Sequence, residues 1–275
     1  MKIMIHPALE GAARVFSFAQ CLDNANPEKR VAMRFLTAEV NACVDGILDE
    51  DPAAEIVVRD GHGPGGIDFE TLTDKASLIS GKGKGGVGFD SSYDAMFIVG
   101  QHSMEGTKGG NLCHTYSPDE IESWRLNGAF IGEFHIHAYQ AGTVHGVPVA
   151  LLSGDEAAVA EAKALIPGIV GVAVKKGFGR ESAQSKSPGE ARKLIRAGAA
   201  EAVRRVRAKK IPPVRIEPPY MLEIRSFEGK EACLETYLKR GGERVDSRTV
   251  VIRSADPKAI LRGSPSATFA PPGGA

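Results

Sequence analysis

The sequence predicts an α/β fold: a three-layer α/β/α core with a largely parallel or mixed sheet, plus a small C-terminal α+β subdomain. Short apolar runs alternate with helical patterns through most of the chain, as is typical of parallel strands covered by helices. The Pro-rich stretch 212–219 marks a change in composition. We therefore expect an α/β domain over 1–211, an α+β subdomain over 212–263 and a disordered, Pro/Gly-rich tail over 264–275.

The individual elements follow from apolar runs and helix start signals. Asn26 and Pro27 begin one helical pattern, and Ser187, Pro188 and Glu190 form the capping box of another. In the main domain, strands are expected at 2–5, 56–58, 96–99, 147–152 and 169–174, and helices at 27–49, 155–165 and 188–209. In the subdomain, strands are expected at 220–226 and 245–252, and helices at 229–239 and 256–262.

Composition excludes several classes of function. Lys plus Arg and Asp plus Glu both number 34, and the zero net charge argues against nucleic acid or an anionic membrane as partner. It also removes self-repulsion, which favours assembly into oligomers. No apolar run has the length of a membrane span or of a signal peptide. The four cysteines are widely spaced, which fits a reducing compartment, so a cytoplasmic protein is expected.

Four chemically active residues share one kind of position. Glu10, His62 and His102 each follow the end of an apolar strand, and Glu133 follows a glycine after another apolar run. That edge of an open α/β sheet is where ligands bind. Two imidazoles and two carboxylates suit Zn²⁺ or a similar ion, which polarises a carbonyl and lowers the pKa of water, as amide hydrolysis requires.

Spacing alone leaves another interpretation open. A single histidine after a strand is more often a loop residue than a ligand, and Glu10 by itself would be a surface carboxylate. The set also lacks a compact motif such as H-E-x-x-H.

A collinear series of short motifs adds weight to the metal interpretation. They are Glu10-Gly11, Arg59-Asp60-Gly61-His62, Val99-Gly100-Gln101-His102, Cys113-His114, Gly132-Glu133 and Ala138-Tyr139. In order and spacing, from residue 1 to about 262, they resemble the bacterial zinc D-aminopeptidase family associated with dipeptide-transport operons.

The resemblance implies an α/β fold, a two-zinc site, removal of N-terminal D-residues from short peptides and assembly into a ring-like decamer. Carried over by position, Glu10, His62, His102 and Glu133 would be metal ligands. His114 would be the catalytic residue beside the metal.

The chain departs from that pattern in two places. The family opens with Ser-x-Asp-x-Glu-Gly and its Asp is a metal ligand, whereas this chain has His6 at the Ser position and Ala8 at the Asp position. Ala8 has no donor atom, so one Zn²⁺ per chain is favoured over two. His137 replaces the family's usual Asn. His6 is either an additional ligand or a residue tolerated at the strand end. His137 is either an additional ligand or a hydrogen-bond donor to a metal ligand or to the substrate.

Three further residues are weaker candidates. Asp60 either orients His62 or stabilises a turn. Lys175 and Arg180, in a basic loop over 175–186, either hold the C-terminal carboxylate of a peptide or are solvated.

Together these features predict a metal-dependent aminopeptidase that hydrolyses short peptides, including those with N-terminal D-residues, as a homo-oligomer and specifically a decamer. Two alternatives remain at this level. One is a non-catalytic oligomeric relative that binds peptide or metal, because Ala8 replaces a family ligand. The other is an amidohydrolase that uses one metal on a non-peptide amide.

Overall fold

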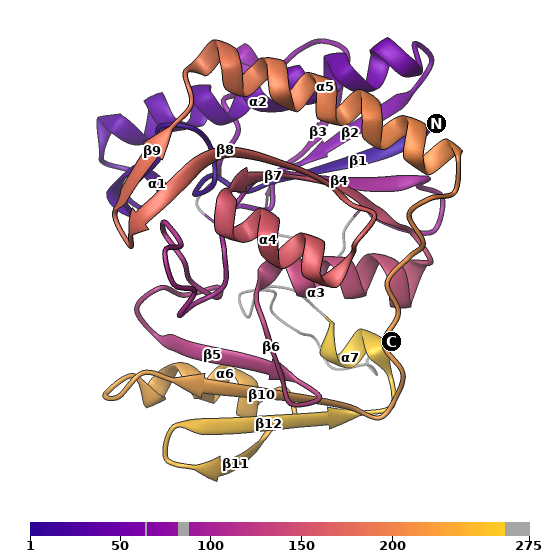
Figure 1. The fold of residues 1–275 in the computed structure, drawn as a ribbon. Coiled ribbons are helices and arrows are strands. Elements are labelled where there is room, and N and C mark those ends of the chain that lie inside the picture. Colours follow the sequence, from indigo (N-terminus) through magenta and orange to yellow (C-terminus); the bar gives the residue numbers. More distant parts are fainter. Residues whose placement is uncertain (64, 82–87, 262–275) are drawn as a thin grey trace.

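Two β-sheets organise the chain (Figure 1). The structure is a computed structural model that describes residues 1–63, 65–81 and 88–261, so the predicted disordered tail at 264–275 lies outside the described residues. In spatial order the larger sheet contains β3 (Ser77–Ile79), β2 (Glu55–Arg59), β1 (Lys2–Pro7), β4 (Ala95–Gln101), β7 (Val149–Asp155), β8 (Val170–Gly179) and β9 (Ser182–Ser185).

The larger sheet is parallel from β3 to β8, and only β9 runs antiparallel to its neighbour. Its central strands are buried: Ile3, Met4 and Ile5 of β1 have no exposed side-chain surface. A strand covered on both faces needs such a continuous apolar run rather than an alternating one. The predicted parallel or mixed sheet is therefore confirmed.

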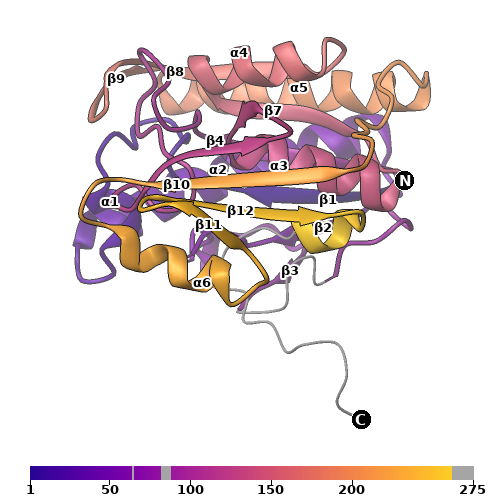
Figure 2. The same cartoon turned by 90° about the horizontal axis from the view of Figure 1, so that it is seen from below.

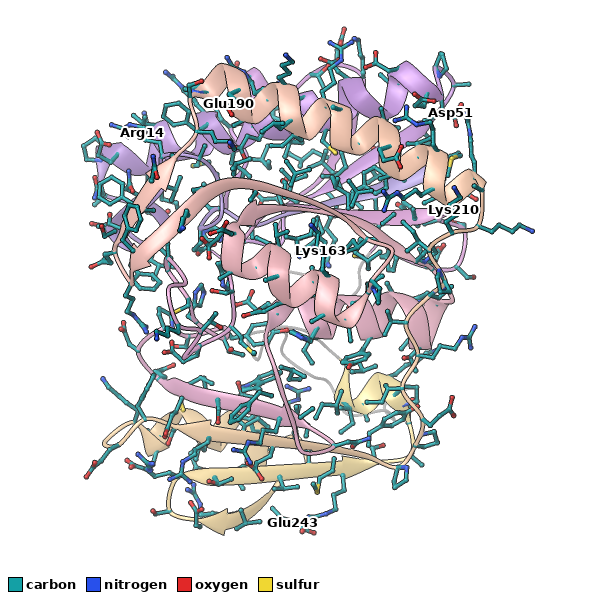
Figure 3. The ribbon with its side chains drawn as sticks, viewed as in Figure 1. Arg14, Asp51, Lys163, Glu190, Lys210 and Glu243 are labelled. Atoms are coloured by element: carbon teal, nitrogen blue, oxygen red, sulfur yellow. The ribbon has the colours of Figure 1, made fainter. Side chains whose placement is uncertain are left out.

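Helices cover both faces of this sheet. Helices α2 (Pro27–Glu50) and α5 (Pro188–Arg207) pack against each other on one face, and α4 (Glu156–Leu165) packs on the other (Figure 1). A short helix, α1 (Ala19–Leu22), precedes α2. Both predicted helix starts are correct, since Asn26 accepts the Glu28 N–H and Ser187 accepts the Glu190 N–H. Figure 3 shows Glu190 at the beginning of α5 and Lys210 just beyond its end.

Helix α3 (Glu133–Tyr139) joins the two cores and continues into a π-helical turn, η2 (Gln140–Val144). Phe134 and Ala138 belong to the hydrophobic core of the larger sheet, whereas Ile136 belongs to the core of the smaller one. This packing fixes the start of α3, and therefore Glu133, between the two sheets.

The smaller sheet is antiparallel and draws on two separate parts of the sequence. Its strands, in spatial order, are β11 (Glu243–Asp246), β12 (Thr249–Ser254), β10 (Tyr220–Ser226), β5 (Ile121–Leu126) and β6 (Ala129–Ile131). Figure 2 shows β10, β11 and β12 side by side. Because β5 and β6 come from the predicted main domain, the two sheets do not divide at residue 211.

Two predicted elements of the C-terminal region differ from the structure. The single strand at 245–252 is instead the β11–β12 hairpin, because the chain turns at Ser247–Arg248 with the Arg248 N–H donated to Asp246. β11 is exposed throughout, so it lacks the apolar pattern of a strand. The helix predicted at 229–239 is a 3-10 turn, η3 (Glu231–Leu234), followed by α6 (Glu235–Leu238). The remaining short elements are α7 (Pro257–Ile260) and η1 (Phe69–Thr71).

Within the described residues, no helix combines the length and the apolar composition needed to cross a bilayer.

Candidate metal centre

Three neighbouring strands bring three of the four predicted ligands to one edge of the larger sheet. β2, β1 and β4 lie side by side, and Glu10, His62 and His102 follow their carboxyl ends. Gly11 donates its N–H to the carbonyl of Gly100 at 2.7 Å. A Cβ at Gly11 would lie 2.1 Å from the Gln101 carbonyl oxygen, so only glycine lets the loop after β1 lie this close to the end of β4. Glu10 is thereby brought next to His102.

Each carboxylate at this edge faces an imidazole nitrogen. His62 Nδ1 lies 3.4 Å from Glu10 Oε2, and the Nε2 atoms of His102 and His114 each lie 3.5 Å from Glu133 Oε1. Ligand atoms of His102, His114 and Glu133 all lie within 4.8 Å of one another. Two ligands of a tetrahedral zinc ion, each about 2.0–2.2 Å from it, lie roughly 3.3–3.6 Å apart. Each separation matches one edge of such a tetrahedron, but the atoms that converge are those of His102, His114 and Glu133, and the Glu10–His62 pair is not part of that group.

The other nitrogen of each of these histidines faces a main-chain carbonyl. The pairs are His62 Nε2 with Cys21 O at 3.2 Å, His102 Nδ1 with Ser103 O at 3.0 Å and His114 Nδ1 with Leu112 O at 2.8 Å. A carbonyl only accepts, so the nitrogen that faces it carries the proton. The nitrogen that faces the carboxylate then has a free lone pair in the neutral ring, the arrangement that metal-binding histidines have.

The electrostatics of the site also fit a cation. Burial pushes the pKa of Glu10 upward, but His62, His102 and His114 outweigh it and hold that pKa well below its usual value. Burial likewise opposes ionisation of Glu133, yet His102 and His114 lower its pKa to about 2. Both carboxylates are therefore ionised.

The carboxylates in turn shift the pKa values of two neighbouring imidazoles. Burial disfavours the charged form of His102, but Glu133 raises its pKa to about 9. The pKa of His62 is also raised, because Glu10 outweighs the effect of burial. Both shifts show that positive charge is favoured next to the two carboxylates. A divalent ion would supply such charge, so the residues fit such an ion.

His114 lies in the same group as the predicted ligands. Its ring stacks on that of His102, with centroids 3.9 Å apart and an interplanar angle of 15°. Phe18 contacts His114 edge-on at 5.6 Å. Burial and the neighbouring His102 lower the pKa of His114, so it is the neutral imidazole of the pair. This geometry permits both a catalytic role and a ligand role.

The three additional candidates lie beside this centre. Asp60 accepts N–H bonds from Gly66 and Ile67, the arrangement expected of a residue that stabilises a turn. His6 and His137 contact each other, with ring centroids 4.2 Å apart. Their Nδ1 and Nε2 atoms do not belong to the group formed by His102, His114 and Glu133.

The predicted basic loop at 175–186 is instead the β8–β9 hairpin, and Lys175 is buried within it. The Lys175 ammonium donates to the carbonyl oxygens of Glu10 and Val15 and, at 2.7 Å, to Asn111 Oδ1. All three N–H bonds are thus used inside the protein, which leaves none for a substrate carboxylate. Lys175 instead ties the loop that carries Glu10 to the loop that precedes His114.

The guanidinium of Arg180 also forms hydrogen bonds within the protein. Its Nη1 donates to both carboxylate oxygens of Glu105 at 3.0 Å, and its Nη2 donates to the Pro118 carbonyl at 2.8 Å. The guanidinium also lies over the ring of Phe18, at 5.2 Å from its centroid. Arg180 therefore supports the wall next to His114, and its charge is already paired.

Replacing Lys175 by Met should destabilise the protein by about 3–5 kcal/mol, because it leaves buried acceptors unpaired in the loops that carry the site. Denaturant unfolding of the zinc-loaded protein measures this loss. The matched control is Lys176→Met, at an exposed neighbouring position. Equal stability of the two variants would contradict the role assigned to Lys175.

Sequence reasoning missed two groups that hold the site together. Asn111 is fully buried, accepts from Lys175 and donates to the carbonyls of Phe16 and Arg180. The Tyr116 N–H donates to Glu133 Oε1 at 2.8 Å. Asn111 stands in a Gly-rich segment that reads as an ordinary loop, and a main-chain donor leaves no signal in the sequence.

Fold and site together define an α/β protein with a divalent-metal centre built from imidazoles and carboxylates. Residues 1–264 match a peptidase family model described as D-aminopeptidase, and the chain belongs to that family. A curated D-aminopeptidase of Bacillus subtilis (strain 168) is 30% identical over 164 residues, which cover 58% of this chain and 58% of that relative. The match thus spans less than two thirds of the relative's length.

The fold also resembles a solved structure over nearly its whole length. That structure is the Zn-dependent D-aminopeptidase DppA from Bacillus subtilis, described as a self-compartmentalizing protease. The TM-score is 0.86 at 25% sequence identity, and the match covers 97% of this chain and 95% of the other.

Proposed function

We propose that this protein is a zinc-dependent aminopeptidase that removes N-terminal residues, D-residues included, from short peptides. Membership of the D-aminopeptidase family supports the reaction, and the similarity to a zinc-dependent D-aminopeptidase supports the metal.

The observation that carries the proposal is the orientation of three histidines. His62, His102 and His114 each direct a protonated nitrogen at a main-chain carbonyl and the other nitrogen at a carboxylate. A histidine in a structural ion pair does not need a hydrogen bond from its second ring nitrogen. A metal-binding histidine does, because that hydrogen bond keeps the ligating nitrogen unprotonated and directed at the metal.

Glu10, His62, His102 and Glu133 would hold one tightly bound Zn²⁺, which supplies polarisation of the scissile carbonyl and a lowered pKa of the attacking water. One ion is favoured over two because Ala8, beside Glu10, carries no donor atom.

His114 would move the protons. Its Nδ1–H is anchored by Leu112, and its ring is neutral at neutral pH, so Nε2 is free to take a proton from the attacking water. The same atom then returns the proton to the leaving amine. Phe18 at the edge of the ring fixes this orientation.

Assembly and location extend the proposal. We assign the protein to the cytoplasm as a homo-oligomer, and specifically as a decamer. The zero net charge and the self-compartmentalizing description of the structural relative support the oligomer.

The test combines metal analysis with peptide hydrolysis. Purified protein should contain about one zinc per chain, hydrolyse D-Ala-D-Ala, lose activity on chelation and regain it with Zn²⁺, because the ion supplies the polarisation. L-Ala-L-Ala, assayed in parallel, measures the preference for D-residues.

Unchanged hydrolysis by fully metal-free protein would refute the proposal. Bound zinc without peptide hydrolysis would instead favour a non-catalytic binding relative or a single-metal amidohydrolase that acts on a non-peptide amide.

A further inference from the structure

The segment that joins β4 to β5 carries both His102 and His114, and a carboxylate from α4 holds it. Glu161 accepts the Met104 N–H with both of its oxygens, each at 3.2 Å, and its Oε1 also accepts the Thr107 hydroxyl at 2.7 Å. Helix α4 itself packs against β7 and β8 of the larger sheet. Glu161 therefore connects this segment to the rigid core of the protein.

The Met104 N–H belongs to the same peptide unit as the Ser103 carbonyl. That carbonyl faces His102 Nδ1 at 3.0 Å and accepts the His114 N–H at 3.2 Å. Glu161 on one side and two histidines on the other thus contact a single peptide unit. A trans peptide unit is planar, so a partner that fixes the direction of its N–H also fixes the direction of its C=O.

The same peptide unit lies next to the third member of the convergent group. A Cβ at Gly132 would lie 2.6 Å from Met104 Cβ, so Met104 packs directly against the residue that precedes Glu133. His102, His114 and Glu133, whose ligand atoms converge, are therefore all connected to the Ser103–Met104 peptide unit.

Other contacts hold the outer part of this segment. The Glu105 N–H donates to Thr115 Oγ1 at 3.3 Å, and Arg180 donates to the Glu105 carboxylate at 3.0 Å. These bonds fold the segment back on itself and pair it with the β8–β9 hairpin. The contact from Glu161 differs from them because it is made to the peptide unit that faces the two histidines.

We propose that Glu161 is a positioning residue of the metal centre: it fixes the Ser103–Met104 peptide unit and, through it, the orientation of His102 and His114. The proposal rests on the zinc centre of the proposed function. Glu161 acts through the reach of its hydrogen bonds rather than through its charge. Its Oε1 accepts from both Met104 and Thr107, so one correctly placed oxygen is enough for the role.

The experiment measures the zinc affinity of the full-length protein by competition with a chelator. Glu161→Asp keeps the charge but withdraws the carboxylate by one methylene, and it should weaken zinc binding by about 10–100-fold, the range for partners of metal-binding histidines. Glu161→Gln loses the charge but keeps the length and one acceptor oxygen, so it should bind zinc as the wild type does. Glu156→Asp is the matched control, because it makes the same change at an exposed position on the same helix.

Two further measurements separate positioning from simple stabilisation. The kcat of Glu161→Asp on D-Ala-D-Ala at saturating zinc should also fall, by roughly 10²-fold, since a displacement of about 1 Å has an effect of that size. Unfolding of the zinc-free variants reports their stability. A role in stability alone would lower the unfolding midpoint of Glu161→Asp and leave the zinc affinity of the folded protein unchanged, which would overturn the proposal.

The proposal is also overturned if Glu161→Gln loses as much zinc affinity as Glu161→Asp, because charge would then be the cause. If Glu161→Asp does not fold, Thr107→Val takes its place. It removes only the hydroxyl that orients the Glu161 carboxylate and should weaken zinc binding by a smaller factor, whereas wild-type affinity in that variant would overturn the proposal. A wild type that binds no zinc would instead refute the proposed function, so the two failures are distinguishable.

Discussion

Glu133→Gln should remove the tightly bound zinc and lower kcat/KM by about 10³-fold or more, which corresponds to ~4 kcal/mol of transition-state stabilisation. Glu133 Oε1 faces both His102 and His114 at 3.5 Å and accepts the Tyr116 N–H, so it is the anion around which this part of the centre is built. The amide of Gln keeps the shape but loses the charge that balances the ion. Metal analysis and steady-state kinetics on a D-dipeptide measure both effects.

The chain offers a closely matched control. Glu156 is the first residue of α4, as Glu133 is of α3, but its side chain is 60% exposed and pairs loosely with Lys176 at 3.9 Å. Glu156→Gln should keep zinc and activity. If Glu133→Gln retained a full equivalent of zinc at wild-type affinity, the placement of the ion beside Glu133 would be wrong.

His114→Ala should reduce turnover by about 10²–10⁴-fold, the range for a positioned acid–base group, while zinc stays bound. The reason is that Glu10, His62, His102 and Glu133 remain available to the ion when His114 is removed. Zinc content and kcat are measured on the same preparation. His145→Ala, at a half-buried histidine that directly follows the π-helical turn, is the control and should change neither.

The alternative outcome is equally informative, because His114 lies within 4.8 Å of the other members of the convergent group. If His114→Ala lost zinc in proportion to activity, His114 would be a metal ligand, and its proton-transfer role would have to pass to another group. Retained zinc with unchanged turnover would refute both roles.

The sequence predicted which residues lie at the candidate metal centre because most of them directly follow the ends of strands. Each of Glu10, His62 and His102 follows an apolar run, and parallel strands end at a common edge, so their meeting follows from the pattern. The caps at Asn26 and Ser187 were predictable for a similar reason, since a cap is a local hydrogen bond between residues two or three positions apart.

The tertiary structure decided what depends on contacts between distant segments. Lys175 sits in a segment that reads as a basic loop, but the β8–β9 pairing buries its ammonium against carbonyls of the loop after β1. The smaller sheet likewise joins β5 and β6 to β10, about a hundred residues further along the chain. In both cases the sequence of one segment contains no pattern that identifies the distant segment with which it pairs.

The sequence by itself therefore determined the parallel sheet, the positions of the three longest helices and the types of residue at the strand ends, since hydrophobic periodicity and local hydrogen bonds specify all of these. Only the tertiary structure decided which nitrogen of each histidine faces a carboxylate, that His114 stacks on His102, and that His6 meets His137. Those relations depend on how β1, α3 and the Gly-rich loops pack, because a shift of one or two ångströms separates a shared metal centre from isolated side chains.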